Sequence, residues 1–218
     1  AIEQRISSGI EKNRMGDFSI SVPAYKGKTE IEIVQVKHDF LFGANAFMIK
    51  GFDTEEKNKR FEDLFVSLFN QACIPYYWQT LEPEQGKLRF TANSEPIYRR
   101  PPPDVVLEFC KKNNISPKGH TLVWNNPTHS VPTWMPKDTA AIEQLIVKRI
   151  NEIAQRYGND IHTWDVVNEV ISYFPNVIMP RDYVYKAFQA AAKAYPPNTK
   201  FILNEATHLW QNSLQEYS

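Results

Sequence analysis

The spacing of hydrophobic and polar positions changes near residue 40. Before it, apolar and polar residues alternate over residues 18–22 and again over 31–33. A turn-rich joint, residues 23–28, separates these two stretches. Alternation with a period of two, bounded by Pro and Gly, predicts a β-hairpin. Because so few residues cannot bury a core of their own, we expect residues 1–38 to form a small N-terminal β extension packed on the main body.

From residue 40 onward, short apolar runs alternate with segments whose apolar residues recur at helical spacing. The apolar runs predict strands at 40–43, at 72–74 continuing into 76–78, and at 118–124, 161–167 and 200–204. Helices are predicted after Thr54, after the triple proline 101–103, between Asp138 and Gly158, between Pro180 and Pro196, and from about residue 209 to 217. Thr54 and Asp138 are residue types that cap helix N-termini, and Gly158 is a common C-terminal stop.

Repeated strand-then-helix units predict an α/β protein with parallel strands joined by right-handed crossovers. Two architectures fit this order, an open doubly wound sheet and part of a (β/α)8 TIM barrel. No Gly-x-Gly-x-x-Gly follows the first strand, which argues against dinucleotide binding. A complete barrel needs roughly 250 residues. If residues 39–218 form a barrel, they supply about its first half, strands one to five.

Composition excludes several function classes. The 218 residues carry 25 Lys and Arg against 25 Asp and Glu, so the chain lacks the basic surface expected of a nucleic-acid binder. No apolar run is long enough to predict a membrane span. The first residues show no signal-peptide core, so we expect a cytosolic protein or a mature chain whose signal has been removed. Cys73 and Cys110 allow at most one disulfide and are predicted to be small buried residues.

Polar and aromatic side chains follow the predicted strands where each strand ends. Because the carboxyl ends of parallel strands meet on one rim, these residues predict a cleft. The strand at 161–167 ends on Asn168 and Glu169, which makes Glu169 the candidate acid or base and Asn168 a partner for a substrate hydroxyl. The alternative is that Glu169 caps the following loop. The other residues predicted at this rim are Tyr77, Trp78, His120, Trp124, Asn125, Asn204 and Glu205.

The chemistry suggested by these residues is that of carboxylates. The five His residues show no paired metal-ligand spacing, and neither a Gly-x-Ser-x-Gly motif nor a phosphate-binding loop is present. We therefore expect no metal and no cofactor. A carboxylic acid in an aromatic, hydroxyl-binding cleft fits glycoside hydrolysis, in which one carboxyl protonates the leaving oxygen and a second attacks or activates water.

Two segments carry a family resemblance. Residues 119–124, Gly-His-Thr-Leu-Val-Trp, and residues 164–169, Trp-Asp-Val-Val-Asn-Glu, resemble two strand motifs of glycoside hydrolase family 10, the endo-β-1,4-xylanases. Residues 81–86 and 201–205 are also similar to that family. The resemblance implies a TIM barrel and retaining, endo-acting hydrolysis of β-1,4-xylosidic bonds. It also implies a polysaccharide substrate, xylan or xylo-oligosaccharides, and a secreted, periplasmic or cell-surface location.

Site roles implied by the resemblance fall on matching positions. Glu169 is similar to the acid/base residue, and Asn168 to the amide that binds the sugar 2-hydroxyl. His120 and Trp124 match residues that bind sugar hydroxyls and stack on the ring. The alternatives are a core histidine for His120 and a packing residue for Trp124. Glu205, on the neighbouring strand, is expected to line the site or to cap a loop.

Three departures from the family pattern affect the expected function. Where the family has Glu-Asn-x-x-Lys-Trp, residues 73–78 read Cys-Ile-Pro-Tyr-Tyr-Trp, so the polar clamp for a distal xylose is absent or replaced by tyrosines. Asn125 replaces a usual histidine. The family's nucleophilic glutamate lies on strand seven, beyond this chain, so we expect these residues to be inactive alone. Two other functions stay open: a non-catalytic polysaccharide-binding protein on the same scaffold, and a different open-sheet α/β enzyme.

Overall fold

The computed structural model describes residues 2–21, 27–28, 30–36, 38–171, 174 and 176–206. The chain divides into two units, Ala1–Asp39 and Phe40–Ser218. In the first unit, helix α1 (Ile2–Arg14) buries none of its residues. Its isoleucines recur every four residues, as expected for one face of a helix, and remain exposed.

The predicted N-terminal β-hairpin requires correction. The described residues between 15 and 39 contain no strand, and residues 22–26 of the predicted turn lie outside the described residues. Phe18, Ile20, Ile31 and Ile33 are between 52% and 69% exposed. Alternation stabilises a strand when one of its faces is buried. Here these side chains are exposed, and the alternating residues form no sheet in the described part of this unit.

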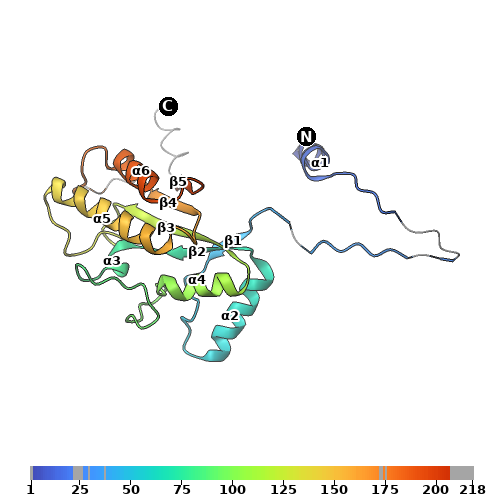
Figure 1. Ribbon diagram of the computed structural model, residues 1–218, viewed down its shortest axis with the longest axis horizontal. Helices are drawn as coiled ribbons and strands as arrows, with labels where there is room; N and C mark the ends of the chain where they lie inside the picture. Colours follow the sequence, from blue (N-terminus) through green and yellow to red (C-terminus); the bar gives the residue numbers. More distant parts are fainter. Residues whose placement is uncertain are drawn as a thin grey trace. The chain divides into compact units, whose positions relative to one another are not determined.

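The second unit is built on a five-stranded parallel sheet whose strands lie side by side in chain order (Figure 1). A doubly wound sheet would instead reverse its strand order at a switch point. The order therefore confirms the barrel type, with strands one to five present. The strands are β1 (Gly43–Asn45), β2 (Gln71–Pro75), β3 (Ser116–Trp124), β4 (Thr163–Asn168) and β5 (Lys200–Asn204).

Helices connect successive strands, as the strand-then-helix pattern predicts (Figure 1). The short helix that directly follows β2 was not predicted. Residues 209–217, predicted to begin a further helix, lie outside the described residues. The helices of this unit are α2 (Glu55–Leu68), α3 (Trp78–Leu81), α4 (Pro103–Lys112), α5 (Thr139–Tyr157) and α6 (Tyr183–Ala194).

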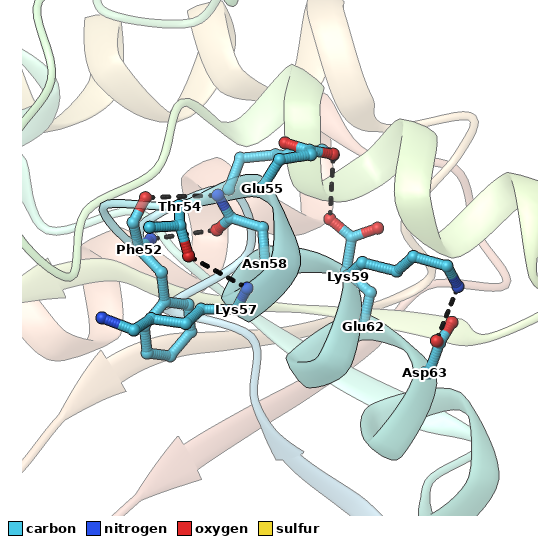
Figure 2. Close-up of polar contacts among 9 residues, drawn as sticks. Phe52, Thr54, Glu55, Lys57, Asn58, Lys59, Glu62 and Asp63 are labelled. Carbon is cyan, nitrogen blue, oxygen red and sulfur yellow. Dashed lines mark hydrogen bonds and ion pairs between the residues drawn. The ribbon is translucent and has the colours of Figure 1, made fainter.

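The predicted helix caps are confirmed. The Thr54 side chain accepts a hydrogen bond of 3.3 Å from the Lys57 N–H at the start of α2 (Figure 2). Asn58 then holds the incoming loop, because its side chain accepts from the Phe52 N–H at 2.9 Å and donates to the Phe52 carbonyl at 3.2 Å (Figure 2). Asp138 caps α5 in the same way through the Ala141 N–H, at 2.7 Å. Such caps satisfy N–H groups that a helix leaves unpaired.

The two faces of the sheet have opposite character because strand side chains alternate. Ala72, Ile74, Trp164 and Val166 are fully buried in the hydrophobic core with the helices. Their neighbours in sequence, such as Cys73, point to the other face, where they line a polar cavity. No helix of the described residues is long and apolar enough to cross a membrane.

The first strand lies later than the sequence predicts. Phe40, Leu41 and Phe42 are about half exposed, and pairing with β2 begins at Gly43 opposite Gln71. The reason lies in Asn70, whose side chain accepts from the Phe42 N–H at 2.7 Å and donates to the Phe40 carbonyl at 2.9 Å. These bonds occupy backbone groups before strand pairing begins.

Candidate active site

A cavity of about 400 Å³ lies over the polar face of the sheet and the carboxyl ends of β3, β4 and β5. All five strands contribute to its walls, so residues distant in sequence meet there. Its lining residues are Gly43, Ala44, Asn45, Gln71, Cys73, Tyr77, Lys118, His120, Trp124, Asp165, Asn168, Glu169 and Asn204.

Asn168 and Glu169 occupy the end of β4. Asn168 is 1% exposed, and its Oδ1 accepts a hydrogen bond of 2.6 Å from the Asn204 side chain on β5. This bond leaves the Asn168 amide nitrogen as the group that can donate to a ligand. Glu169 donates its backbone N–H to the Asn204 carbonyl at 2.8 Å and has a left-handed backbone, with φ 49°. The left-handed residue ends the strand at the cavity, and such strained positions cluster at functional sites.

A buried carboxylate holds His120 in place. Asp165, 1% exposed, accepts from His120 Nδ1 at 2.8 Å and pairs with Lys118 Nζ at 2.9 Å. Because a carboxylate oxygen only accepts, the His120 Nδ1 must carry the proton in this bond. The pair therefore fixes the orientation of the imidazole ring within the cavity.

Aromatic rings form one wall of the cavity. Phe47, Tyr77 and Trp124 pack as a separate buried cluster. The Trp124 ring stacks on His129, with centroids 5.8 Å apart. The guanidinium carbon of Arg100 lies 4.1 Å from the centre of the Tyr77 ring. Burial raises the pKa of Tyr77, so its hydroxyl stays protonated at neutral pH.

Arg149, on α5, ties the ends of β2 and β3 together. It is 2% exposed and donates to the carbonyls of Leu122, at 2.7 Å, and Thr121, at 3.3 Å, and to that of Tyr76. Burial lowers the pKa of this guanidinium to about 10, so it keeps its charge at neutral pH. These bonds fix the strand ends that carry Tyr77 and the residues after His120.

The cavity brings together most of the residues predicted for the site: Glu169, Asn168, His120, Trp124, Tyr77 and Asn204. Trp78 requires correction. It is 4% exposed, donates its Nε1–H to Glu82 Oε2 at 2.8 Å and lies 5.0 Å from the Arg149 guanidinium carbon. The strand ends at Pro75, so Trp78 begins helix α3 and turns into the core instead of the cleft.

Glu205 and Asn125 also lie outside the cavity lining. The Glu205 carboxylate accepts from the N–H groups of Ile171, at 3.2 Å, and Ala206, at 3.1 Å. It therefore caps a loop, which is one of the two roles expected for it. Asn125 follows the last residue of β3.

Lys118 and Asp165 were missed by the sequence analysis. A signal was present, because each is a charged residue inside a predicted buried strand. Charged side chains are rarely buried unless they are paired. Lys118 and His120 are two residues apart on β3 and therefore share a face, opposite Asp165 on β4.

Among the carboxylates of the cavity, Asp165 and Glu169 differ in their partners. Asp165 is held by Lys118 and His120, whereas no ion pair of Glu169 occurs within the described part of the chain. Groups of three or more residues that could hold a metal ion do not occur among the described residues either. The arrangement offers one unpaired carboxylate, a donor amide and a stacking wall, which suits proton transfer to a bound sugar.

Comparison with known proteins agrees with this geometry. The sequence model of Glycosyl hydrolase family 10 matches residues 38–215. The chain is 30% identical to "Endo-1,4-beta-xylanase 5" of Arabidopsis thaliana over 213 residues, which is 93% of this chain and 33% of that protein. It is 30% identical over 140 residues to the "Beta-1,4-xylanase" of Dictyoglomus thermophilum, covering 59% of this chain and 39% of the relative.

Solved structures share the fold. Native xylanase 10B from Thermotoga maritima superposes with a TM-score of 0.61 at 22% identity, covering 80% of this chain and 55% of that one. The endo-1,4-beta-xylanase from Caldicellulosiruptor owensensis gives 0.62 at 22% identity, covering 82% and 54%. The chain thus spans about half the length of these TIM-barrel structures and a third of the Arabidopsis relative. On the family match, this chain belongs to glycosyl hydrolase family 10.

Proposed function

We propose that the full-length protein containing this chain cleaves β-1,4-xylosidic bonds within xylan, with Glu169 as acid and then base. The observation that carries the proposal is an unpaired carboxylate, Glu169, beside the donor amide of Asn168 in one cavity. Relatives named endo-1,4-beta-xylanase support the reaction class. A xylanase of Thermotoga petrophila with the same fold was solved in complex with xylobiose, which supports xylose units as ligands.

Four residues of the cavity contact the sugar in this proposal. The Glu169 carboxyl protonates the departing glycosidic oxygen and later removes a proton from the attacking water. The Asn168 amide nitrogen donates to a sugar hydroxyl, because its oxygen is already bonded to Asn204. His120, oriented by Asp165, offers its second ring nitrogen to another hydroxyl, and Trp124 stacks on the sugar ring.

We propose further that the nucleophile comes from outside these five strands. Retention requires a second carboxyl about 5–5.5 Å from the first, across the scissile bond. Asp165 also lines the cavity, but Lys118 and His120 occupy both of its oxygens. Attack by Asp165 would break an ion pair with Lys118 and a charge-assisted hydrogen bond with His120 in a buried site. Residues 1–218 alone should therefore not complete a double displacement.

The first test replaces the proposed acid. Glu169→Gln in the full-length protein should abolish turnover of xylan, whose leaving groups need protonation. Aryl xylobiosides with activated leaving groups should lose far less in the glycosylation step measured by stopped flow. Glu205→Gln is the matched control, because it removes a loop-capping carboxylate that directly follows the neighbouring strand β5. Equal losses on the two substrate classes would reject Glu169 as the acid.

The second test concerns the nucleophile. Residues 1–218 and the full-length protein are each treated with a 2-fluoro-xylobioside that traps the covalent intermediate. Mass spectrometry should find the label in the full-length protein, at a residue beyond 218. Stoichiometric labelling of Asp165, or of any residue in the 218-residue chain, would show that the nucleophile is already present here.

A further inference from the structure

A second cavity, of about 440 Å³, adjoins the candidate active site. Phe47 lines this second cavity and Tyr77 lines the first. Their rings meet edge-on with centroids 5.9 Å apart, so the pair forms a wall between the two cavities. The second cavity lies between the segment after β1, residues 47–52, and the loop of residues 92–102 before α4. A ligand bound in the first cavity could extend a side group over this wall.

The second cavity is positively charged. Its lining includes Lys50, Arg99 and Arg100, and no Asp or Glu among the described residues. Lys50 is already paired with Glu55, at 3.0 Å, and Glu62, at 3.4 Å. Neither arginine forms an ion pair with a carboxylate in the described part of the chain. Two arginines therefore face this cavity without a counter-ion.

Arg100 has two donor nitrogens that no group in the described part of the protein uses. Its Nη1 donates to the Arg99 carbonyl at 2.8 Å, whereas Nε and Nη2 have no hydrogen-bond partner within the described residues. Nε is also buried, and an unpaired buried donor is unfavourable. Nη2 is the unpaired donor that keeps accessible surface, and a guanidinium N–H forms a strong, charge-assisted hydrogen bond with a carboxylate oxygen. Tyr77 supports the flat face of the same group, with Cζ 4.1 Å from the ring centre.

The loop that carries the arginines is held in place from within. Arg89, 7% exposed, donates to the carbonyls of Thr80, at 2.8 Å, Glu95, at 3.0 Å, and Arg100, at 3.4 Å. The Arg100 N–H closes a turn on the Ile97 carbonyl at 2.9 Å. Because these bonds already order the loop, it loses little conformational entropy when a ligand binds.

We propose that this second cavity, here called the arginine cavity, binds a carboxylate carried by a sugar side group, a hexuronic acid branch of the xylan chain. The inference rests on the proposed function, which places the xylan backbone in the first cavity. Arg99 and Arg100 supply the charge, and Phe47, Ile97 and Tyr98 supply apolar surface for the sugar ring. The volume lies within the roughly 300–1,000 Å³ usual for small-molecule sites.

The test measures binding of three ligands by calorimetry to the full-length protein carrying Glu169→Gln, which prevents cleavage. The ligands are xylotetraose, xylotetraose with one glucuronic acid branch, and xylotetraose with one glucose branch of the same size. The acidic branch should bind about tenfold tighter than the neutral branch, the scale of one charge-assisted hydrogen-bonded pair. Raising the salt concentration should reduce this preference, because salt screens charge.

Arg100→Gln, added to that protein, should remove the preference for the acidic branch and leave the affinity for xylotetraose unchanged. Arg100→Lys should keep part of the preference, since it retains the charge but loses the planar group that lies over Tyr77. Arg181→Gln is the matched control, because Arg181 is 96% exposed and lies outside both cavities. If Arg100→Gln weakens all three ligands equally, Arg100 only positions Tyr77, and the inference is overturned.

The inference and the proposed function fail in different ways. Binding of xylotetraose with no gain from the acidic branch overturns the arginine cavity as a carboxylate site and leaves the proposed function standing. If none of the three ligands binds and the unmodified protein does not cleave xylan, the proposed function is wrong and the inference falls with it.

Discussion

Gly119→Ala should destabilise the sheet strongly, because of how closely β3 approaches Trp164 on β4. A Cβ atom added at Gly119 would lie 2.1 Å, 2.2 Å and 2.7 Å from three carbons of the Trp164 ring. Ordinary carbon contacts are about 3.5–4.0 Å, so the Trp164 ring would have to move by roughly 1 Å or more. Trp164 is fully buried, its Nε1–H donates to the Ile161 carbonyl at 2.9 Å, and Tyr76 and Tyr195 flank its ring.

Because the ring cannot retreat, the added methyl group must separate the strands. Overpacking a core lowers the free energy of unfolding by about 1–3 kcal/mol. A Cβ atom is fixed to the backbone and the ring is held by its neighbours, so we expect a loss at the upper end, about 3 kcal/mol. For a domain of this size that corresponds to a fall in Tm of about 6–12 °C. Urea unfolding followed by fluorescence and circular dichroism measures the change. Gly16→Ala is the control, since nothing lies within 4 Å of its added Cβ.

A double-mutant cycle with Trp164→Leu isolates the contact. The smaller side chain removes the clash, so Gly119→Ala should cost much less in that background. A Gly119→Ala protein whose free energy of unfolding stays within about 0.5 kcal/mol of the parent would refute the packing argument.

Three further outcomes are expected. Arg149→Met should lower the free energy of unfolding by about 3 kcal/mol, because buried carbonyls of β2 and β3 lose their donor; unchanged urea unfolding would contradict this. Trp124→Ala should weaken xylo-oligosaccharide binding by about 1–3 kcal/mol, and calorimetry showing no change would count against stacking. Burial raises the thiol pKa values of Cys73 and Cys110 to about 12, so at pH 8 only about one thiol in 10⁴ is ionised. Iodoacetamide should therefore label the native protein slowly and the urea-unfolded protein quickly, and rapid native labelling at pH 8 would show that the thiols are accessible and ionised.

Sequence patterns were enough to predict the alternating order of strands and helices in the main unit, apart from the short helix α3 and the late start of β1. Thr54, Asp138 and Gly158 mark helix ends through bonds to backbone groups within four residues, so local sequence was enough. The strand at 200–204 was predicted with its observed bounds. The strand-end pattern also predicted that Asn168 and Glu169 face a cleft, because parallel strands in successive units deliver their carboxyl ends to one rim.

Which strand-end residues face the cavity depends on contacts between segments far apart in the chain. Trp78 turns into the core because a helix begins directly after β2, and Glu205 is bonded to the N–H of Ile171, 34 residues away. The same holds for Asp165, whose partners Lys118 and His120 lie on another strand.

The arginine cavity and the uncovered N-terminal alternation have the same explanation. Arg100 contacts Tyr77 because of the conformation of an irregular loop, which has no hydrophobic periodicity to predict it. The alternation at 18–22 predicts a strand, but it does not identify a surface that would bury one face of that strand. A hydrophobic pattern specifies which side chains would gain from burial. The partner that buries or pairs each one is set by packing between segments far apart in the chain, and that is decided only when the chain folds.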